Sequence, residues 1–190
     1  MHFDEWLFGL LNGTYRAEWL DAIAPTWRSK YFWFPLYLFV LAIVGINFKR
    51  YFLPFLLCAI VTVTIADTLS SKVIKPLVKR DRPCRNDQLT KPAVVLINCG
   101  AGYSFTSSHA TNHFAIAFFF LLTIGSILTY SKGLFLIWAA SISYCQVYVG
   151  VHYPVDITAG AILGSAIGIS MAYLFSRKWV FSNYHSAPVA

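Results

Sequence analysis

The chain has 190 residues and a formal charge of +7; apolar side chains make up 57% of it and charged ones only 12%. Soluble globular domains carry about 25% charged residues, so this composition excludes an ordinary soluble domain. The basic residues stand at the ends of long uncharged stretches and not along one polar face, which excludes a nucleic-acid-binding surface. The positive charge fits a protein that contacts anionic lipids or receives an anionic substrate.

Residues 1–30 do not resemble a signal peptide, because Asp4 and Glu5 come first and no basic start precedes an apolar core. Apolar side chains recur there at helical spacing, at Phe3, Trp6, Leu7, Leu10 and Leu11. We predict one or two amphipathic helices that lie at the membrane interface. A short additional span is the alternative.

Apolar stretches long enough to cross a hydrocarbon core of about 30 Å follow this segment. They comprise residues 31–48, 51–73, 107–130, 134–151 and 155–175. We predict an all-α fold, a polytopic transmembrane helical bundle with about five spans. It forms a single domain over residues 1–190, with the interfacial helices at 1–30, the bundle at 31–175 and a polar tail at 176–190.

The last stretch carries a ridge of small residues, because Gly160, Gly164 and Gly168 recur at four-residue spacing. Such a ridge lets another helix approach closely. We expect it to serve packing within the bundle, and the seam of a homodimer is the alternative.

Polar clusters stand at residues 75–83, 106–109 and 152–156, each beside an apolar stretch. Counting the passages through the membrane places all of them on the same side. Of the 15 Lys and Arg residues, ten lie on that side and five on the other, and the positive-inside rule taken alone would make the cluster side cytoplasmic.

The first cluster contains Lys75 and Arg82. A guanidinium can bind two phosphate oxygens at once and an ammonium supplies a compact charge, so the pair suits a phosphoryl group. An interfacial anchor is the plainer interpretation of such a basic loop. We assign that role, or attraction of an anionic substrate, to Lys79, Arg80 and Arg85.

The second cluster, Ser107-Ser108-His109, opens an apolar stretch. Free backbone N–H groups at a helix start bind anions, and serine is a favoured N-cap. A histidine at this place can donate a proton to a departing oxygen. His113 lies four residues after His109 and shares its helix face, so a metal pair is an alternative, although no third ligand is evident.

The third cluster contains His152 and Asp156, with Pro154 in the first turn of the last helix. Asp156 is placed to accept a hydrogen bond from one ring nitrogen of His152, which leaves the other nitrogen free to attack phosphorus. A capped structural histidine is the alternative.

Taken together, Lys75-x6-Arg82-Pro, Ser107-x-His109 and His152-x3-Asp156 resemble the tripartite signature of the type 2 phosphatidic acid phosphatase superfamily. The resemblance covers about residues 75–164. It implies an integral-membrane lipid phosphate phosphatase that needs no metal or cofactor. His152 would be the nucleophile that forms a phosphohistidine, with Asp156 as its orienting partner and His109 as the general acid. The phosphate ligands implied by the family are Lys75, Arg82, Ser107 and the Ser108 amide.

The chain departs from the family pattern at two places. Thr106 and Ser108 replace a proline and a glycine in the second motif, which is a mild change because only a backbone amide is needed at 108. Gln146 stands where the family has an arginine that binds phosphate. Gln146 can still donate hydrogen bonds to a substrate, but the lost charge-assisted contact is worth about 1.5–3 kcal/mol. We hypothesise that Arg80 or Arg85 compensates.

The resemblance predicts removal of a terminal phosphate from a lipid phosphate or pyrophosphate. Undecaprenyl pyrophosphate, phosphatidylglycerol phosphate and the lipid A 1-phosphate are the candidate substrates, and the lipid is expected to enter sideways between spans. A lipid-to-lipid phosphotransferase and a non-catalytic lipid phosphate binder or transporter are the alternatives. The expected partners are the lipid substrate and membrane lipids, without nucleic acid.

The resemblance also implies a multi-pass protein of the inner (cytoplasmic) membrane whose active site faces the periplasm or the exterior. Cys84 and Cys99 flank the polar loop, so a disulfide can form there in an oxidising compartment. Cys58 and Cys145 lie inside apolar stretches and are expected to be inert packing residues.

Overall fold

A computed structural model of the chain describes residues 3–126 and 132–179, and all regular secondary structure in these residues is helical. The all-α prediction is therefore confirmed for this part of the chain. The elements in order are α1 (Phe3–Phe8), η1 (Gly9–Thr14), α2 (Glu18–Trp27), α3 (Phe34–Asn47), α4 (Lys49–Asp67), η2 (Thr68–Ile74), α5 (Lys75–Val78), η3 (Pro83–Arg85), α6 (Ser108–Thr123), η4 (Ile124–Ser126), α7 (Lys132–Tyr148) and α8 (Pro154–Ser176).

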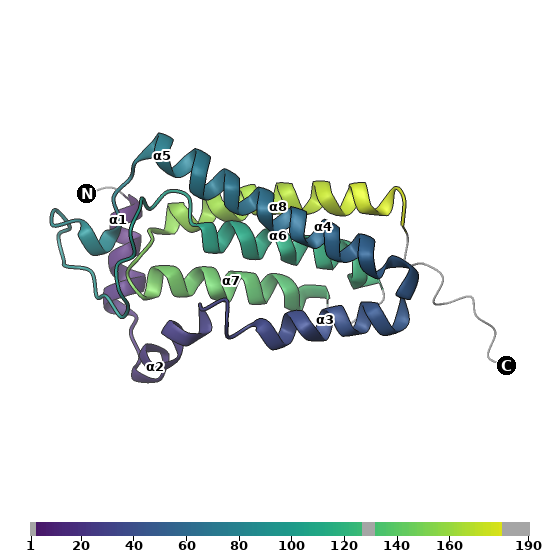
Figure 1. The fold of residues 1–190 in the computed structure, drawn as a ribbon. Coiled ribbons are helices and arrows are strands. Elements are labelled where there is room, and N and C mark those ends of the chain that lie inside the picture. Colours follow the sequence, from purple (N-terminus) through teal and green to yellow (C-terminus); the bar gives the residue numbers. More distant parts are fainter. Residues whose placement is uncertain (1–2, 127–131, 180–190) are drawn as a thin grey trace.

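The long helices α3, α4, α6, α7 and α8 run along one common axis (Figure 1). Helix α6 packs against α4, α7 and α8, and most extensively against α8. At one end of the bundle lie α1, α5, the loop that joins α5 to α6, and the starts of α6 and α8 (Figure 1), where the Ser107 amide donates to the Asp156 carbonyl at 3.1 Å. All three polar clusters therefore belong to the same end, as the sequence predicts.

The glycine ridge of α8 explains the close packing of α6 on α8. Gly160, Gly164 and Gly168 are buried. A Cβ on Gly160 would lie 2.8 Å from the Ser107 carbonyl oxygen, and one on Gly164 would overlap the Thr111 carbonyl. The ridge thus serves packing within the chain, as expected, and it is covered and cannot form a dimer seam. Whether the protein forms a homodimer by another surface stays a prediction.

The centre of the bundle is filled by aromatic side chains. Phe55 of α4 stacks on Phe120 of α6 with 5.8 Å between ring centroids, and it contacts Phe119 and Phe175 at 5.3 and 6.0 Å. Three helices that are far apart in sequence, α4, α6 and α8, are thereby joined through one cluster, which fixes the relative positions of the helix ends that carry the polar residues.

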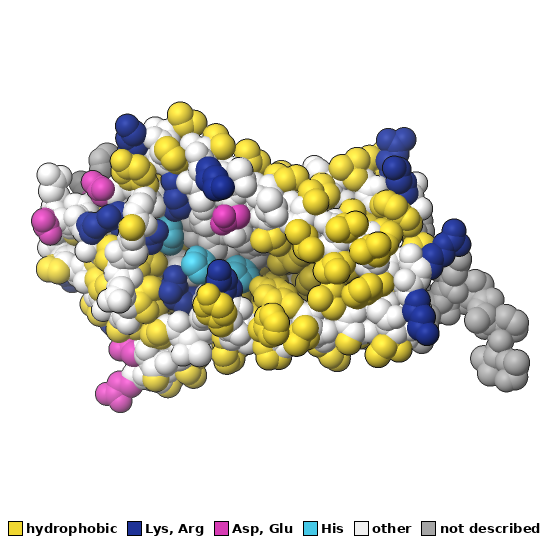
Figure 2. Space-filling view, in the orientation of Figure 1, with side chains coloured by type: hydrophobic (Ala, Val, Ile, Leu, Met, Phe, Trp, Pro, Cys, Tyr) yellow, Lys and Arg dark blue, Asp and Glu magenta, His cyan; other side chains and the backbone are white. Residues whose placement is uncertain are grey.

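The face of the bundle shown in Figure 2 is largely apolar, with Lys and Arg side chains at both ends. The helical stretch Lys49–Arg85 and helix α8 are each long and apolar enough to cross a membrane, and Phe34–Asn47 and Gly133–Tyr148 are shorter apolar helices. The long helices thus occur where the five spans are predicted. How many of them cross the bilayer stays a prediction.

The N-terminal segment is helical but does not stand apart from the bundle. Phe8 is buried against Tyr153, with 5.4 Å between ring centroids. The buried amide of Asn12 donates to the carbonyls of Val94 and Tyr148 at 2.9 and 2.8 Å, and its oxygen accepts from the Val94 amide at 2.8 Å. The segment therefore closes one end of the bundle, and its position at a membrane interface stays a prediction.

Candidate active site

The loop of residues 79–107 folds back over the helix ends and is tied there at several points. Cys84 and Cys99 form a disulfide with 5.9 Å between their Cα atoms, which answers the question that the sequence leaves open. The Ser104 amide donates to the Arg80 carbonyl at 2.7 Å. Lys75 Nζ donates to the carbonyls of Tyr103 and Ser104 at 2.8 and 3.0 Å, so its ammonium lies at the base of this loop.

His152 lies in the turn between α7 and α8 and is only 2% exposed. Its Nδ1 is 3.5 Å from Asp156 Oδ2 and 3.3 Å from Ser104 Oγ. The predicted contact between the histidine and the carboxylate is therefore present, and Nε2 is the ring nitrogen that remains for chemistry. Burial lowers the pKa of His152 to about 4 against the opposing effect of Asp156, so the ring is neutral at pH 7 and retains a lone pair.

Ser104 is a member of this group that the sequence analysis missed. It is completely buried, and its hydroxyl donates to Asp156 Oδ2. The Tyr153 amide donates to the same carboxylate oxygen at 2.9 Å within the capping box of α8. No sequence pattern singles out Ser104, because it reaches α8 only through the fold of the long loop.

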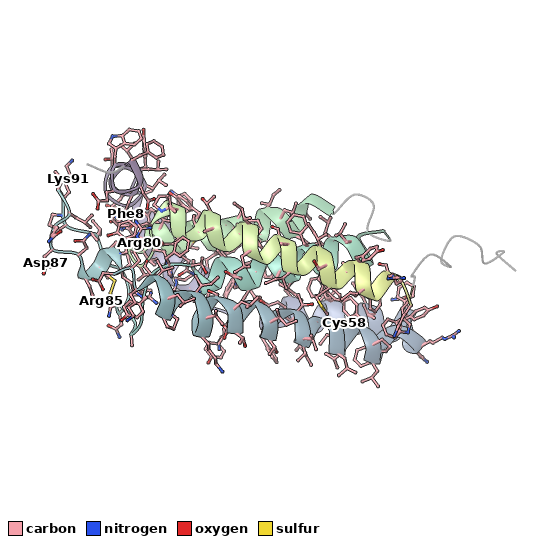
Figure 3. All side chains as sticks on the ribbon, turned by 90° about the horizontal axis from the view of Figure 1, so that it is seen from above. Phe8, Cys58, Arg80, Arg85, Asp87 and Lys91 are labelled. Carbon is pink, nitrogen blue, oxygen red and sulfur yellow. A yellow bond between two sulfur atoms is a disulfide. The ribbon has the colours of Figure 1, made fainter. Side chains whose placement is uncertain are left out.

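Arg80 neutralises the other oxygen of the buried Asp156. Its Nη1 donates to Asp156 Oδ1 at 2.8 Å and its Nη2 donates to Asp4 Oδ2 at 2.5 Å. The guanidinium also stacks over the Tyr153 ring at 3.9 Å. Arg80 and Phe8 are close together at this end of the bundle, whereas Cys58 lies toward the other end (Figure 3). Arg80 is thus committed to two carboxylates, and the contribution of Asp4 from α1 was not foreseen.

The second cluster caps α6 as predicted. Ser107 is the N-cap residue and its Oγ accepts a long hydrogen bond of 3.5 Å from the Ala110 amide. Ser108 Oγ lies 3.0 Å from Ser70 Oγ and 2.9 Å from Ser71 Oγ, so η2 fixes this helix start. His109 follows in the first turn.

His152, Arg82 and Arg28 lie close enough to His109 for their charges to act on it. The structure therefore brings the two histidines of the sequence motifs into one site. The described histidines are 109, 113 and 152, and histidine side chains line a hollow that is bordered by Lys and Arg (Figure 2). Apolar side chains continue from this hollow along the bundle (Figure 2).

His113 does not join the site. Its Nδ1 lies 2.7 Å from the His109 carbonyl oxygen and its ring packs edge-on against Trp138 at 5.1 Å. Within residues 3–126 and 132–179, no group of three or more His, Cys, Asp or Glu side chains is arranged to hold a metal ion. The contacts of His113 fit a packing residue and not half of a metal pair.

The remaining cations of the first cluster differ in their contacts. Arg82 Nε donates to the Gly102 carbonyl at 3.3 Å, and its charge acts on Lys75, His109 and His152. Arg85 also donates to the Gly102 carbonyl and is exposed. Arg82 therefore belongs to the centre of the site and Arg85 to its outer loop.

Gln146 is completely buried near the end of α7. Its backbone carbonyl accepts hydrogen bonds from the amides of Val151 and His152, both at 3.2 Å, and its Oε1 accepts one from Arg28 Nε at 3.1 Å. Arg28 follows α2 and was not singled out in the sequence. Neither Arg80 nor Arg85, the residues hypothesised to compensate for Gln146, contacts Gln146 among the described interactions; Arg28 does.

A comparison with protein families tests the resemblance that the sequence motifs indicate. The PAP2 superfamily model matches residues 55–180. The chain belongs to the PAP2 superfamily. The resemblance drawn from the sequence motifs is thereby confirmed.

Two relatives match this PAP2 chain over most of its length. A protein of Bacteroides thetaiotaomicron described as a lipid A 4'-phosphatase is 30% identical over 189 residues, which cover 98% of this chain and 82% of the relative. A protein of Porphyromonas gingivalis with the same description is 29% identical over 196 residues, which cover 97% and 79%.

Two solved structures share the fold. The crystal structure of Aquifex aeolicus LpxE superposes with a TM-score of 0.65 at 24% identity, over 91% of this chain and 96% of that one. The crystal structure of a transmembrane PAP2 type phosphatidylglycerolphosphate phosphatase from Bacillus subtilis gives 0.64 at 22% identity, over 94% and 87%. Together with its apolar helices, these relationships identify the chain as a membrane protein.

Proposed function

We propose that this PAP2 protein is a lipid phosphate phosphatase that hydrolyses a phosphate monoester on the sugar of a lipid A-type substrate. The observation that carries the proposal is the buried His152, held through Nδ1 by Asp156 and Ser104, in a site shared with His109 and with cations from distant segments. This arrangement orients a neutral imidazole toward an anion-binding region, as in-line attack on phosphorus requires.

The proposed reaction has two steps. First, His152 Nε2 attacks phosphorus and forms an N–P bond, while His109 donates a proton to the sugar oxygen as the P–O bond breaks. Second, His109 removes a proton from a water molecule, which attacks phosphorus and releases inorganic phosphate from His152. Lys75, Arg82, Ser107 and the Ser108 amide are proposed to hold the phosphoryl oxygens in both steps.

The descriptions of the relatives support lipid A as the substrate but name a position, the 4'-phosphate, that is not among the candidates from the sequence. Both carry the description lipid A 4'-phosphatase, and each aligns with nearly the whole of this chain. The resemblance taken alone suggested the 1-phosphate of lipid A, undecaprenyl pyrophosphate or phosphatidylglycerol phosphate. We therefore place the 4'-phosphate monoester first. The apolar side chains that continue from the hollow offer a surface for the acyl chains (Figure 2).

The proposed topology has five spans, formed by α3, by α4 with its extension to α5, and by α6, α7 and α8. The site then lies at one face of the membrane. The Cys84–Cys99 disulfide in the loop over the site favours an oxidising compartment, so we propose that this face is periplasmic or exterior. A cysteine introduced at the exposed Asp87 should react with an impermeant maleimide in intact cells, whereas one at Lys178 should react only after the membrane is opened. The opposite labelling pattern contradicts the orientation.

An activity assay in detergent tests the function. Phosphate release is measured from hexa-acylated lipid A carrying a 1- or a 4'-phosphate, and the lipid product is identified by mass spectrometry. We expect release from the 4'-position, loss of activity in His152→Ala and His109→Ala, and full activity in Cys58→Ala. An active His152→Ala variant contradicts the mechanism.

The product also separates the alternatives. A phosphotransferase yields a second phosphorylated lipid in place of free phosphate, and a non-catalytic binder retains the lipid without turnover. Release from the other candidate lipids with none from the 4'-position contradicts the proposed substrate.

A further inference from the structure

The N-terminal segment delivers a cation to the site. Arg28 follows α2, and its Nε donates to Oε1 of the completely buried Gln146 at 3.1 Å. The Gln146 carbonyl in turn accepts a hydrogen bond from the His152 amide at 3.2 Å. Arg28 is therefore joined through one residue to the backbone of the proposed nucleophile.

The guanidinium of Arg28 is only partly used by the protein. Nε is engaged, but Nη1 and Nη2 have no hydrogen-bond or ion-pair partner among the residues that the structure describes. Burial lowers the pKa of Arg28 and the charge of Arg82 lowers it further, with no carboxylate opposing them. Asp156 acts on Arg82 but not on Arg28, so Arg28 is the half-buried arginine that lacks a counter-ion. Such a charge is costly, and an anion bound beside it removes that cost.

The side chain of Gln146 shows the same incompleteness. Its Nε2 is buried and has no hydrogen-bond partner among the described residues. Buried donors are nearly always paired in native structures, so an unpaired one calls for an absent ligand or water. Free donors on Arg28 and Gln146 therefore occur side by side in the region that also contains Arg82 and His109.

The position of Arg28 is fixed by its neighbours. Trp27 Nε1 donates to Ser141 Oγ of α7 at 2.9 Å, and its ring packs edge-on against Trp33 at 4.6 Å. The Arg28 amide donates to the Ala24 carbonyl at 3.2 Å and ends α2. A pre-ordered guanidinium of this kind binds an anion without a large loss of conformational entropy.

We infer that Arg28, held by Gln146, binds the non-bridging oxygens of the substrate phosphoryl group and takes the part that an arginine at position 146 plays in the family pattern. The N-terminal segment is then a component of the active site and not only a membrane anchor. The inference rests on the proposed phosphatase function for its substrate, but the binding of a phosphate-like ion tests it independently of turnover.

The test compares Arg28→Ala, Arg28→Lys and the double variant Arg28→Ala/Gln146→Arg with the unmodified protein. The measurements are kcat/KM for phosphate release and the dissociation constant of orthovanadate, determined by calorimetry in detergent. Lys30→Ala is the matched control, because Lys30 is an exposed cation two residues away.

We expect Arg28→Ala to lower kcat/KM and to raise the dissociation constant of orthovanadate, each by about tenfold to 150-fold, which is the effect of losing one charge-assisted contact. Arg28→Lys should lose less, the double variant should recover most of the loss by restoring an arginine beside His152, and Lys30→Ala should match the unmodified protein. Vanadate binding and turnover that stay within twofold in Arg28→Ala overturn the inference, while an inactive His152→Ala in the same series leaves the proposed function standing.

If Arg28→Ala fails to fold, Arg28→Lys and the double variant still decide the matter. If Arg28 has only a structural role, an arginine at position 146 should not restore vanadate binding. A folded double variant that binds vanadate at least tenfold more weakly than the unmodified protein therefore also overturns the inference. A protein that binds vanadate through Arg28 but releases no phosphate from any lipid contradicts the proposed function and not the role of Arg28.

Discussion

Ser104→Ala tests whether the loop over the site helps to orient the proposed nucleophile. The Ser104 hydroxyl is completely buried, donates to Asp156 Oδ2 and lies 3.3 Å from His152 Nδ1. Removing a hydrogen bond to a charged acceptor costs about 1.5–3 kcal/mol of folding free energy. Asp156 Oδ2 keeps its bond of 2.9 Å from the Tyr153 amide, so the carboxylate should stay in place.

The catalytic effect follows from what remains. Without Ser104 the imidazole of His152 is held only by Asp156 at 3.5 Å, and we expect kcat to fall about tenfold, which is a barrier increase of about 1.4 kcal/mol. KM should change little, because Ser104 holds the histidine and not the phosphate.

The assay is phosphate release from the lipid substrate at saturation, with thermal unfolding in detergent measured in parallel. Asp156→Asn is the reference variant and should be impaired further, because it removes the charge that opposes Arg80. Ser104→Ala with an unchanged kcat, measured beside an impaired Asp156→Asn, would show that Ser104 only fills space and would refute this reasoning.

Three further predictions concern acidity, the disulfide and helix packing. Because burial lowers the pKa of His152 from 6.5 to about 4, the unfolded chain binds the extra proton between these values, so stability should fall as pH drops from about 6.5 to 4. The value of kcat/KM should fall near pH 4, and a midpoint near 6.5 would refute the lowering of the His152 pKa by burial. Cys84→Ser opens the link to Cys99 across 15 residues, and should cost about 3 kcal/mol and lower activity, measured by unfolding and phosphate release; dithiothreitol should reproduce the effect only in the unmodified protein. Gly164→Ala should cost about 1–3 kcal/mol by forcing α8 away from α6, whereas Gly133→Ala, with open space at its Cβ position, should be neutral; equal stabilities in a thermal unfolding assay would contradict the packing argument.

The sequence is sufficient for those parts of the site that depend on local spacing. His152 and Asp156 are four residues apart, with Pro154 opening a helix between them, and one helical turn brings the carboxylate to the ring. Ser107 caps α6 for the same local reason. The long apolar stretches likewise predict helices, because a backbone surrounded by lipid must pair its own N–H and C=O groups.

Interactions across long sequence separations were decided only by the tertiary structure. Arg80 and Asp156 are 76 residues apart, and the choice of Arg80 as the partner of the carboxylate depends on how the loop folds over α8. Asp4 and Ser104 join that group from α1 and from the loop, and neither belongs to a recognisable pattern. Burial of Asp156 requires such partners, but burial alone does not specify which residues provide them.

The difference is clearest at Gln146. Its identity in the sequence shows that this chain lacks the arginine of the family pattern at that position, and the sequence analysis proposed Arg80 or Arg85 as the substitute. The fold instead brings Arg28 to it across 118 residues, because Trp27 anchors the N-terminal segment on α7. Local sequence determined the helices and the motif residues within them, whereas helix packing determined which distant charges meet, since electrostatic and hydrogen-bond contacts depend on distances in space that sequence separation does not encode.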